Sequence, residues 1–185
     1  MINRQFFFDQ ARKTLFDGKL KQSQTDGLNA ILDAWDKGYE KKDDRWLAYM
    51  LATAHHETDR TMQPIREYGK GKGREYGTAD VQTGQVYYGR GFVQLTWRDN
   101  YDKMSKLLKD DLVKNADLAL RPDYASIIMF EGMIRGSFTG KKLENYFSPT
   151  ADDWVNARKI INGLDKANAI AAYGKNYYAA ISHTT

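Results

Sequence analysis

The chain of 185 residues has no cysteine and only three prolines. The absence of cysteine excludes disulfide frameworks, cysteine-ligated zinc or iron–sulfur sites and cysteine nucleophiles. No apolar run approaches the ~20 residues that a membrane-spanning helix needs. The aromatic run Phe6–Phe8 is short and flanked by charged residues, which is not typical of a signal-peptide core. We therefore expect no signal peptide and a protein made in the cytoplasm.

The composition is typical of a globular protein. Apolar residues make up 42% of the chain and charged residues 28%, and the length suits one domain over residues 1–185. Lysine and arginine exceed aspartate and glutamate by 28 to 24, which gives a net charge of +4. This mild excess suits an anionic partner such as nucleic acid, a cell-wall polymer or a membrane surface, and it does not choose among them.

The spacing of apolar residues predicts a mainly α fold. Helices are expected over residues 5–16, 24–37, 44–54 and beyond, 97–109, 123–135, 151–161 and 166–181. The expected capping residues are Asp43 or Asp44 for the third helix, Ser148 or Thr150 for the sixth and Asp165 for the last. Seven glycines between residues 68 and 91 exclude a regular helix there and favour a short β-hairpin or an ordered loop.

Glu57 falls on the apolar stripe of the third expected helix. It lies three residues after Ala54 and seven after Met50, so at about 100° per residue it shares their face. Desolvation on such a face favours the protonated carboxylic acid, which is the form that protonates a leaving oxygen in a glycosidase. The alternative is a glutamate at a fraying helix end whose carboxylate reaches water.

Two further glutamates could supply the second carboxylate of a glycosidase. Glu67 follows Pro64, which interrupts any helix running on from Glu57, so Glu67 lies on a separate element and could face Glu57 across a cleft. Inverting glycosidases hold two carboxyl groups about 6.5–9.5 Å apart with a water between them. Glu75 is an alternative for the second role. Either glutamate could instead be a surface partner of nearby arginines and lysines.

Other hydrolytic chemistries lack the residues they need. His55 and His56 are adjacent, so their side chains diverge on a helix, and the zinc-peptidase pattern needs a histidine where Arg60 stands. No glycine-flanked serine elbow is present either. We therefore expect a mechanism without a metal ion or another cofactor.

Four segments form a recognisable set, in the order Ala54–Thr58, Tyr87–Trp97, Asn100–Tyr101 and Ile160–Leu164. The set resembles the family 19 glycoside hydrolases, which include plant-type chitinases and phage endolysins with lysozyme-like folds. The run Tyr-Tyr-Gly-Arg-Gly followed by Gln-Leu-Thr-Trp is long and specific, and the matching segments span residues 46–165. The resemblance implies a single lysozyme-like helical domain with the hairpin or glycine-rich loop near an active-site cleft.

The resemblance also implies roles for seven residues. Glu57 matches the general acid, Glu67 the residue that activates water, and Thr96 a hydroxyl that helps to hold that water. The residues that match positions lining the sugar cleft are Tyr88, Gln94, Asn100 and Asn162. Amides and hydroxyls suit sugar hydroxyl and acetamido groups, and aromatic rings suit the flat faces of sugars. Plant chitinases carry an arginine in the helix that follows, whereas this chain has none from residue 164 onward.

Two polymers are candidate substrates, peptidoglycan and chitin. Small size, no cysteine and no signal peptide resemble a phage endolysin, which accumulates in the host bacterial cytoplasm and acts on the wall in the periplasm after holin-type release. Basic residues beside the proposed site also favour the anionic polymer, namely Arg66, Lys70, Lys72 and Arg74. We therefore expect a muramidase-type enzyme that cleaves a β-1,4 bond of peptidoglycan with inversion. Chitin or chito-oligosaccharides are the alternative substrate.

The remaining expectations concern other partners. A non-catalytic glycan-binding relative would lack an acid or a base, and Glu57 is present. A nucleic-acid-binding protein would have no reason to place Glu57 on an apolar stripe, so we expect no nucleic acid partner. The C-terminal segment carries Lys159, Lys166 and Lys175 among apolar residues. It could contact an anionic outer-membrane surface, or it could simply pack on the core. We expect a monomer.

Overall fold

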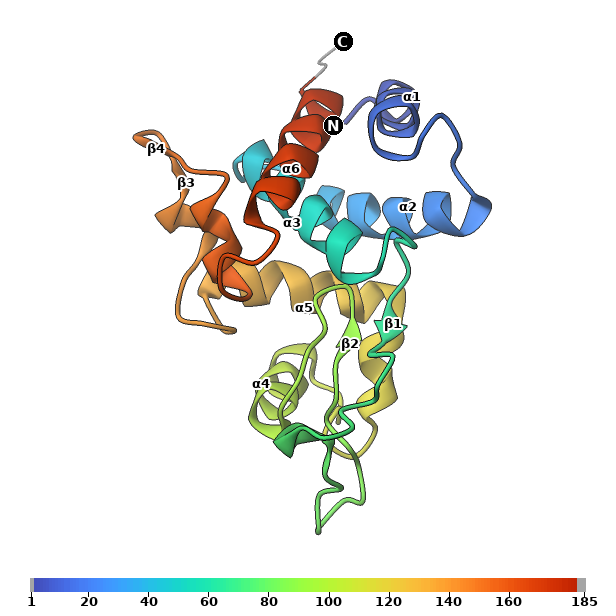
Figure 1. The fold of residues 1–185 in the computed structure, drawn as a ribbon, viewed down its shortest axis with the longest axis vertical. Coiled ribbons are helices and arrows are strands. Elements are labelled where there is room, and N and C mark those ends of the chain that lie inside the picture. Colours follow the sequence, from blue (N-terminus) through green and yellow to red (C-terminus); the bar gives the residue numbers. More distant parts are fainter. Residues whose placement is uncertain (1, 183–185) are drawn as a thin grey trace.

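A computed structural model describes residues 2–182. Its helices form two groups on either side of α5 (Pro122–Arg135), which crosses the middle of the molecule in Figure 1. The upper group consists of α1 (Arg4–Leu15), α2 (Gln22–Asp36), α3 (Asp44–Glu57) and α6 (Ala167–Ile181). The lower group consists of α4 (Arg98–Leu108) and the strands β1 (Ile65–Arg66) and β2 (Arg90–Gly91). The expected mainly α fold is confirmed.

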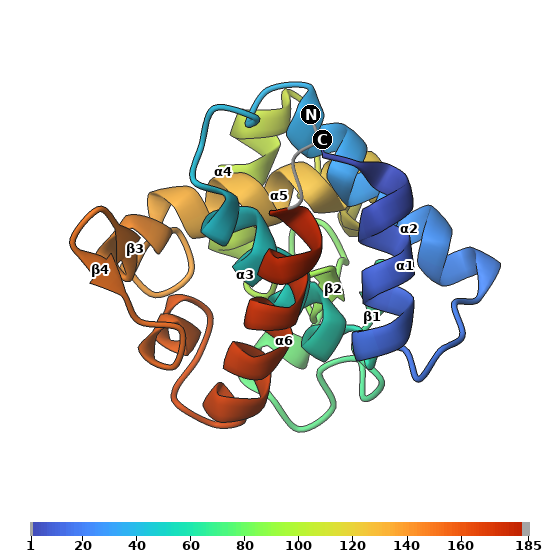
Figure 2. The same ribbon diagram turned by 90° about the horizontal axis from the view of Figure 1, so that it is seen from above.

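Helix α3 runs through the core of the upper group. The Asp43 side chain accepts a hydrogen bond from the Arg45 backbone N–H and begins the helix, as one of the two expected caps. Every residue from Leu47 to His55 is buried, and α3 packs against α6 (Figure 2). Close packing on all sides holds such a helix rigidly. Its last residue, Glu57, therefore projects from a fixed point.

The chain leaves α3 through a strained turn that packs against α2. Three residues of this turn have a positive φ although none is glycine, namely Asp59, Arg60 and Met62. A Cβ atom at Gly27 of α2 would lie 1.6 Å from the carbonyl oxygen of Met62, so only glycine fits this contact. The turn sets the direction of the segment that follows, and that segment carries Glu67.

The glycine-rich segment is an ordered loop closed by a small sheet. Strands β1 and β2 are antiparallel, with Ile65 opposite Gly91. Between them the chain makes successive turns and a short 3-10 helix, Glu75–Gly77. A Cβ atom at Gly77 would lie 1.8 Å from the Gly71 carbonyl oxygen, so the loop folds closely on itself at these two glycines. Both expected features, a hairpin ladder and an ordered loop, are present.

Two expectations for the last part of the chain are wrong. Residues 151–161 are not a helix, because β3 (Phe147–Ser148) pairs with β4 (Ala151–Asp152) and a 3-10 helix follows at Asn156–Ile160. The Arg45 guanidinium binds the carbonyl oxygens of Ser148 and Ala151 and holds this hairpin against the start of α3. Ser148 and Thr150 therefore cap no helix.

Asp165 does not cap the last helix either. Helix α6 begins after Lys166, whose φ of 58° is left-handed, and no side chain caps it. The Asp165 carbonyl oxygen instead accepts a hydrogen bond from Arg158 Nε at 3.3 Å. The apolar residues of α6, among them Ile170, Tyr177 and Ile181, are buried in the core. Helix α6 therefore packs on the core, which was one of the two roles expected for it; the other was contact with a membrane surface.

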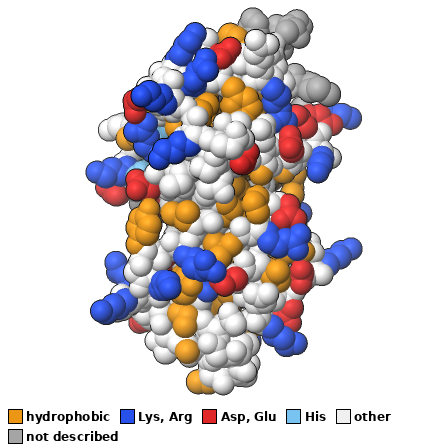
Figure 3. All heavy atoms as spheres, turned by 90° about the vertical axis from the view of Figure 1, so that its right-hand side faces the viewer, with side chains coloured by type: hydrophobic (Ala, Val, Ile, Leu, Met, Phe, Trp, Pro, Cys, Tyr) orange, Lys and Arg blue, Asp and Glu red, His pale blue; other side chains and the backbone are white. Residues whose placement is uncertain are grey.

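Charges of both signs are mixed on the side of the molecule shown in Figure 3. Lysine and arginine side chains lie among aspartate and glutamate side chains over this face, with hydrophobic side chains between them. The positive net charge is therefore not gathered into one basic patch on this side. Among residues 2–182, no helix is both long and apolar enough to cross a membrane.

Candidate active site

A cleft of about 490 Å³ opens at the end of α3. Its walls come from the glycine-rich loop, the segment that leads into α4, and two later stretches of chain. The lining residues are Glu57, Arg74, Tyr76, Val93, Gln94, Thr96, Trp97, Asn100, Phe138, Ile161 and Asn162. The structure thus brings together five of the seven residues proposed from the sequence, Glu57, Gln94, Thr96, Asn100 and Asn162. They come from segments as far apart as residues 57 and 162.

Glu57 is held by an arginine that the sequence analysis did not single out. Its Oε1 accepts a hydrogen bond from Arg158 Nη1 at 2.6 Å. The Arg158 side chain is 4% exposed and the Glu57 side chain 17% exposed, so the ion pair is largely shielded from water. Glu57 Oε2 has no hydrogen-bond partner among the described residues. Arg158 thus holds one carboxyl oxygen and leaves the other unbonded.

Arg158 could not be recognised as a partner from sequence spacing. It lies 101 positions after Glu57, within the 3-10 helix where a regular helix was expected. A second hydrogen bond, from Arg158 Nε to the Asp165 carbonyl oxygen, fixes the plane of its guanidinium group. Arg158 therefore supplies a positive charge next to the end of α3, although no arginine follows residue 164.

Glu67 does not line the cleft, but it contacts Tyr76, which does. Its Oε1 accepts a hydrogen bond from the Tyr76 hydroxyl at 3.1 Å, and its Oε2 accepts one from the Gly89 backbone N–H at 3.0 Å. The Glu67 backbone N–H in turn donates to the Gly89 carbonyl oxygen at 2.7 Å. Burial and the hydrogen bond to Glu67 both raise the pKa of the Tyr76 hydroxyl, which therefore stays a donor at neutral pH. The Glu67 carboxylate is thereby fixed in orientation.

Glu75, the alternative second carboxylate, has none of these contacts. It is exposed at the start of the short 3-10 helix, and its side chain has no hydrogen bond or ion pair among the described residues. It is not part of the cleft lining, although its neighbours Arg74 and Tyr76 are. Glu67 is not part of the lining either, but Tyr76 and Gly89 hold its carboxylate in a fixed orientation, which nothing does for Glu75 among the described residues.

Hydrogen bonds hold two amide side chains of the cleft lining, one against the small sheet and one at the start of α4. Gln94 has a φ of 53°, and its Nε2 donates to the carbonyl oxygens of Ile65 and Gly91, each at 3.2 Å. Asn100 Nδ2 donates to the Thr96 carbonyl oxygen at 3.0 Å. These bonds occupy amide N–H groups and fix the side chains. Asn162 is exposed, and its Oδ1 accepts a bond from the Gly163 N–H.

Tyr88, which was expected beside these residues, is not part of the cleft lining. Its side chain is buried, and its ring stacks on the Arg90 guanidinium, whose central carbon lies 3.7 Å from the ring centre. Arg90 is itself buried and forms an ion pair with Asp117 at 2.8 Å. The Tyr101 hydroxyl donates to the Tyr88 carbonyl oxygen at 2.9 Å. Tyr88 therefore belongs to the packing beneath the cleft and does not line it.

The aromatic surface of the cleft comes from Trp97 and Tyr76 instead. The Trp97 side chain is 47% exposed, and its ring meets the Tyr76 ring edge to face with centres 5.4 Å apart. An exposed aromatic wall of this kind suits the apolar face of a sugar ring. Trp97 is the last residue of the long sequence motif, so its place in that motif could have indicated it.

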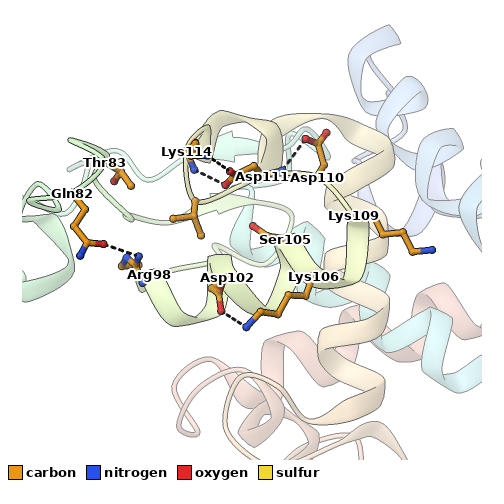
Figure 4. A pocket seen from close by; sticks show the side chains of 11 residues that line it. Gln82, Thr83, Arg98, Asp102, Ser105, Lys106, Lys109, Asp110, Asp111 and Lys114 are labelled. Carbon is orange, nitrogen blue, oxygen red and sulfur yellow. Dashed lines mark hydrogen bonds and ion pairs between the residues drawn. The ribbon is translucent and has the colours of Figure 1, made fainter.

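A larger hollow of about 680 Å³ lies on the other side of α4 (Figure 4). Its charged side chains largely neutralise one another. Lys106 binds Asp102 at 2.7 Å and Lys114 binds Asp111 at 3.2 Å. The third carboxylate of the lining, that of Asp110, accepts hydrogen bonds from the Tyr124 hydroxyl and from the Asp111 backbone N–H, each at 2.8 Å. All three carboxylates in the hollow therefore have partners. Within residues 2–182, no group of three or more histidine, cysteine, aspartate or glutamate residues is placed to hold a metal ion.

Comparisons with known proteins point to one family. Residues 37–144 match the glycoside hydrolase family 19, described as chitinase class I. The sequence is also 39% identical over 131 residues to an acidic endochitinase of Petunia hybrida. That match covers 69% of this chain and 47% of the relative, so the chain spans about half the length of this curated protein.

Solved chitinase structures have a similar fold. Chitinase C from Streptomyces griseus HUT6037 has a TM-score of 0.61 at 20% identity, covering 95% of this chain and 76% of that one. A family 19, class IV chitinase from Zea mays has a TM-score of 0.61 at 16% identity, covering 97% and 92% of the two chains. At such low identity the likeness shows the fold alone, and it confirms the lysozyme-like helical fold expected from the sequence.

Proposed function

Because the chain belongs to the chitinase class I family, family 19 of the glycoside hydrolases, we propose that it hydrolyses β-1,4-linked polysaccharides that contain N-acetylglucosamine. One observation carries this proposal. Glu57 stands at the end of a rigid buried helix, with one carboxyl oxygen held by Arg158 and the other unpartnered in the cleft. A fixed carboxyl group beside an aromatic wall and several amides suits acid catalysis on a sugar.

The proposed mechanism uses two carboxyl groups and one water molecule. Glu57, in its protonated form, gives the proton on Oε2 to the glycosidic oxygen as the bond to the anomeric carbon breaks. Water attacks the opposite face of that carbon, and Glu67 accepts the proton that the water loses. Thr96 helps to hold the water. The products are a new reducing end with inverted configuration and a new hydroxyl group on the leaving sugar.

Peptidoglycan is the substrate that we propose first. The cleft presents Arg74, and the same loop carries Lys70 and Lys72, so the surroundings of the cleft favour a polymer with negative charges. On this proposal the protein acts as an endolysin, which collects in the host bacterial cytoplasm and reaches the wall after a holin opens the membrane. Chitin is the second candidate, because the petunia relative is an endochitinase.

The test is digestion of purified peptidoglycan and of chitin oligosaccharides by the wild type, Glu57→Gln and Glu75→Gln. We expect the wild type and Glu75→Gln to release new reducing ends, and Glu57→Gln to release almost none. Proton NMR of the first products should show the inverted anomer. Retained anomers would overturn the inverting mechanism, and undiminished activity of Glu57→Gln would overturn the assignment of the acid. The faster of the two substrates decides between a muramidase and a chitinase.

A further inference from the structure

Arg74 differs from every other arginine in this protein. Ten of the eleven arginines form an ion pair with an aspartate or glutamate, and all eleven lie within the described residues. Arg74 has no carboxylate partner, it is exposed, and it lines the cleft. Glu57 is the other charged residue of the lining, and Arg158 already neutralises it. The cleft therefore holds one unpaired positive charge.

The backbone around Arg74 is fixed. Its N–H donates to the Gly71 carbonyl oxygen at 2.9 Å, and its own carbonyl oxygen accepts from the Gly77 N–H at 2.9 Å. Two residues further on, Tyr76 packs against Trp97 and donates to Glu67. The loop thus presents the guanidinium group from the same ordered turn that holds the aromatic wall. A ligand of Arg74 would lie close to a sugar bound on that wall.

From this placement we infer that Arg74 binds a carboxylate carried by the polysaccharide and so selects acidic cell-wall glycans over neutral chitin. A guanidinium group donates two parallel hydrogen bonds to a carboxylate, and such charge-assisted pairs are about twice as strong as neutral ones. Chitin has no carboxylate. The muramic acid units of peptidoglycan carry lactyl groups, which end in a free carboxylate or continue into an acidic peptide. This inference rests on the proposed function, because it names the substrate class of the same cleft.

The experiment compares one polymer before and after its charge is removed. Glycan strands freed of their peptides have lactyl carboxylates, and conversion of these groups to methyl amides gives matched neutral strands. The affinity for both forms is measured by calorimetry in a Glu57→Gln background, which keeps the strands intact. Arg74→Gln and Arg74→Glu are the test variants. Lys72→Gln is the matched control, because Lys72 is an exposed cation on the same loop that does not line the cleft.

The quantity that matters is the ratio of affinities for the charged and the neutral strands. We expect Arg74→Gln to lower this ratio about tenfold, Arg74→Glu to lower it further, and Lys72→Gln, which removes a charge outside the cleft lining, to lower it far less. Equal weakening for both strands, or a ratio that Lys72→Gln lowers as much as Arg74→Gln does, would overturn the inference. Turnover by the wild type is recorded separately. A selective effect of Arg74 on binding without any turnover would uphold this inference and refute the proposed catalysis.

Discussion

His55 makes the stability of the protein depend on pH in a way that can be measured. Its side chain is 1% exposed, and it lies between the rings of Phe16 and Tyr173 with centre distances of 5.0 and 4.5 Å. Nδ1 shares a hydrogen bond of 3.0 Å with the Tyr177 hydroxyl, while Nε2 has no partner within residues 2–182. Burial, with smaller contributions from the charges of Arg60 and His56, lowers the pKa of His55 from 6.5 to about 4.

The sign and size of the effect follow from this pKa. The unfolded chain takes up a proton at His55 near pH 6.5, whereas the folded chain does so only near pH 4. Between these values the unfolded state binds more protons, so the free energy of unfolding falls as the pH falls. Over the whole range this difference lowers the free energy of unfolding by about 3 kcal/mol. About 2 kcal/mol of this decrease occurs between pH 7 and pH 5.

Urea unfolding at pH 7 and pH 5 tests this reasoning. We expect the wild type to lose about 2 kcal/mol between the two conditions. His55→Gln, whose amide can still bond to Tyr177, should lose much less, although it starts from a lower stability. His56→Gln is the matched control and should behave like the wild type, because His56 is only half-buried. An equal loss in the wild type and His55→Gln would refute the assignment.

Three further predictions test the site and its supports. Glu67→Gln should lower turnover at least a hundredfold and Glu75→Gln less than twofold, and the reverse order would exchange their roles. Arg158→Met should lower the free energy of unfolding by about 3 kcal/mol, and by clearly less in a Glu57→Gln background. Equal losses in both backgrounds would mean that the two side chains are not coupled. Gly27→Ala should lower the free energy of unfolding, measured with urea, by about 2 kcal/mol or more, because its Cβ would overlap the Met62 carbonyl oxygen. Unchanged stability would contradict this contact.

The parts of the fold that local spacing determines were predictable. Helix α3 begins at the expected cap Asp43 and keeps its apolar residues buried, as their spacing indicated. Residues 151–161 show where local pattern fails. Their apolar spacing is helical, but Arg45, over a hundred residues earlier, binds the carbonyl oxygens of Ser148 and Ala151 and stabilises a hairpin. Such a contact is a tertiary effect that no short window of sequence contains.

The residues of the candidate site were likewise predictable only in part from the sequence. The long motif and the Asn100–Tyr101 segment predicted that Gln94, Thr96 and Asn100 lie near Glu57, and they line one cleft with it. Tyr88, in the same motif, is buried because the side chain of Arg90 lies against its ring. The pairing of Glu57 with Arg158 could not be foreseen either. This pairing depends on how the chain returns to the end of α3. The spacing of apolar residues indicates which faces are buried, but it does not indicate the partners of charged groups.

The most direct test of the central claim separates proton donation from the rest of catalysis. Glu57→Gln and Glu67→Gln are each assayed on a natural oligosaccharide and on its dinitrophenyl β-glycoside, whose leaving group departs without a proton. If Glu57 is the acid, Glu57→Gln should lose about a thousandfold on the oligosaccharide and less than about tenfold on the dinitrophenyl substrate. Glu67→Gln should lose activity on both. Equal losses of Glu57→Gln on the two substrates would contradict the assignment of Glu57 as the proton donor.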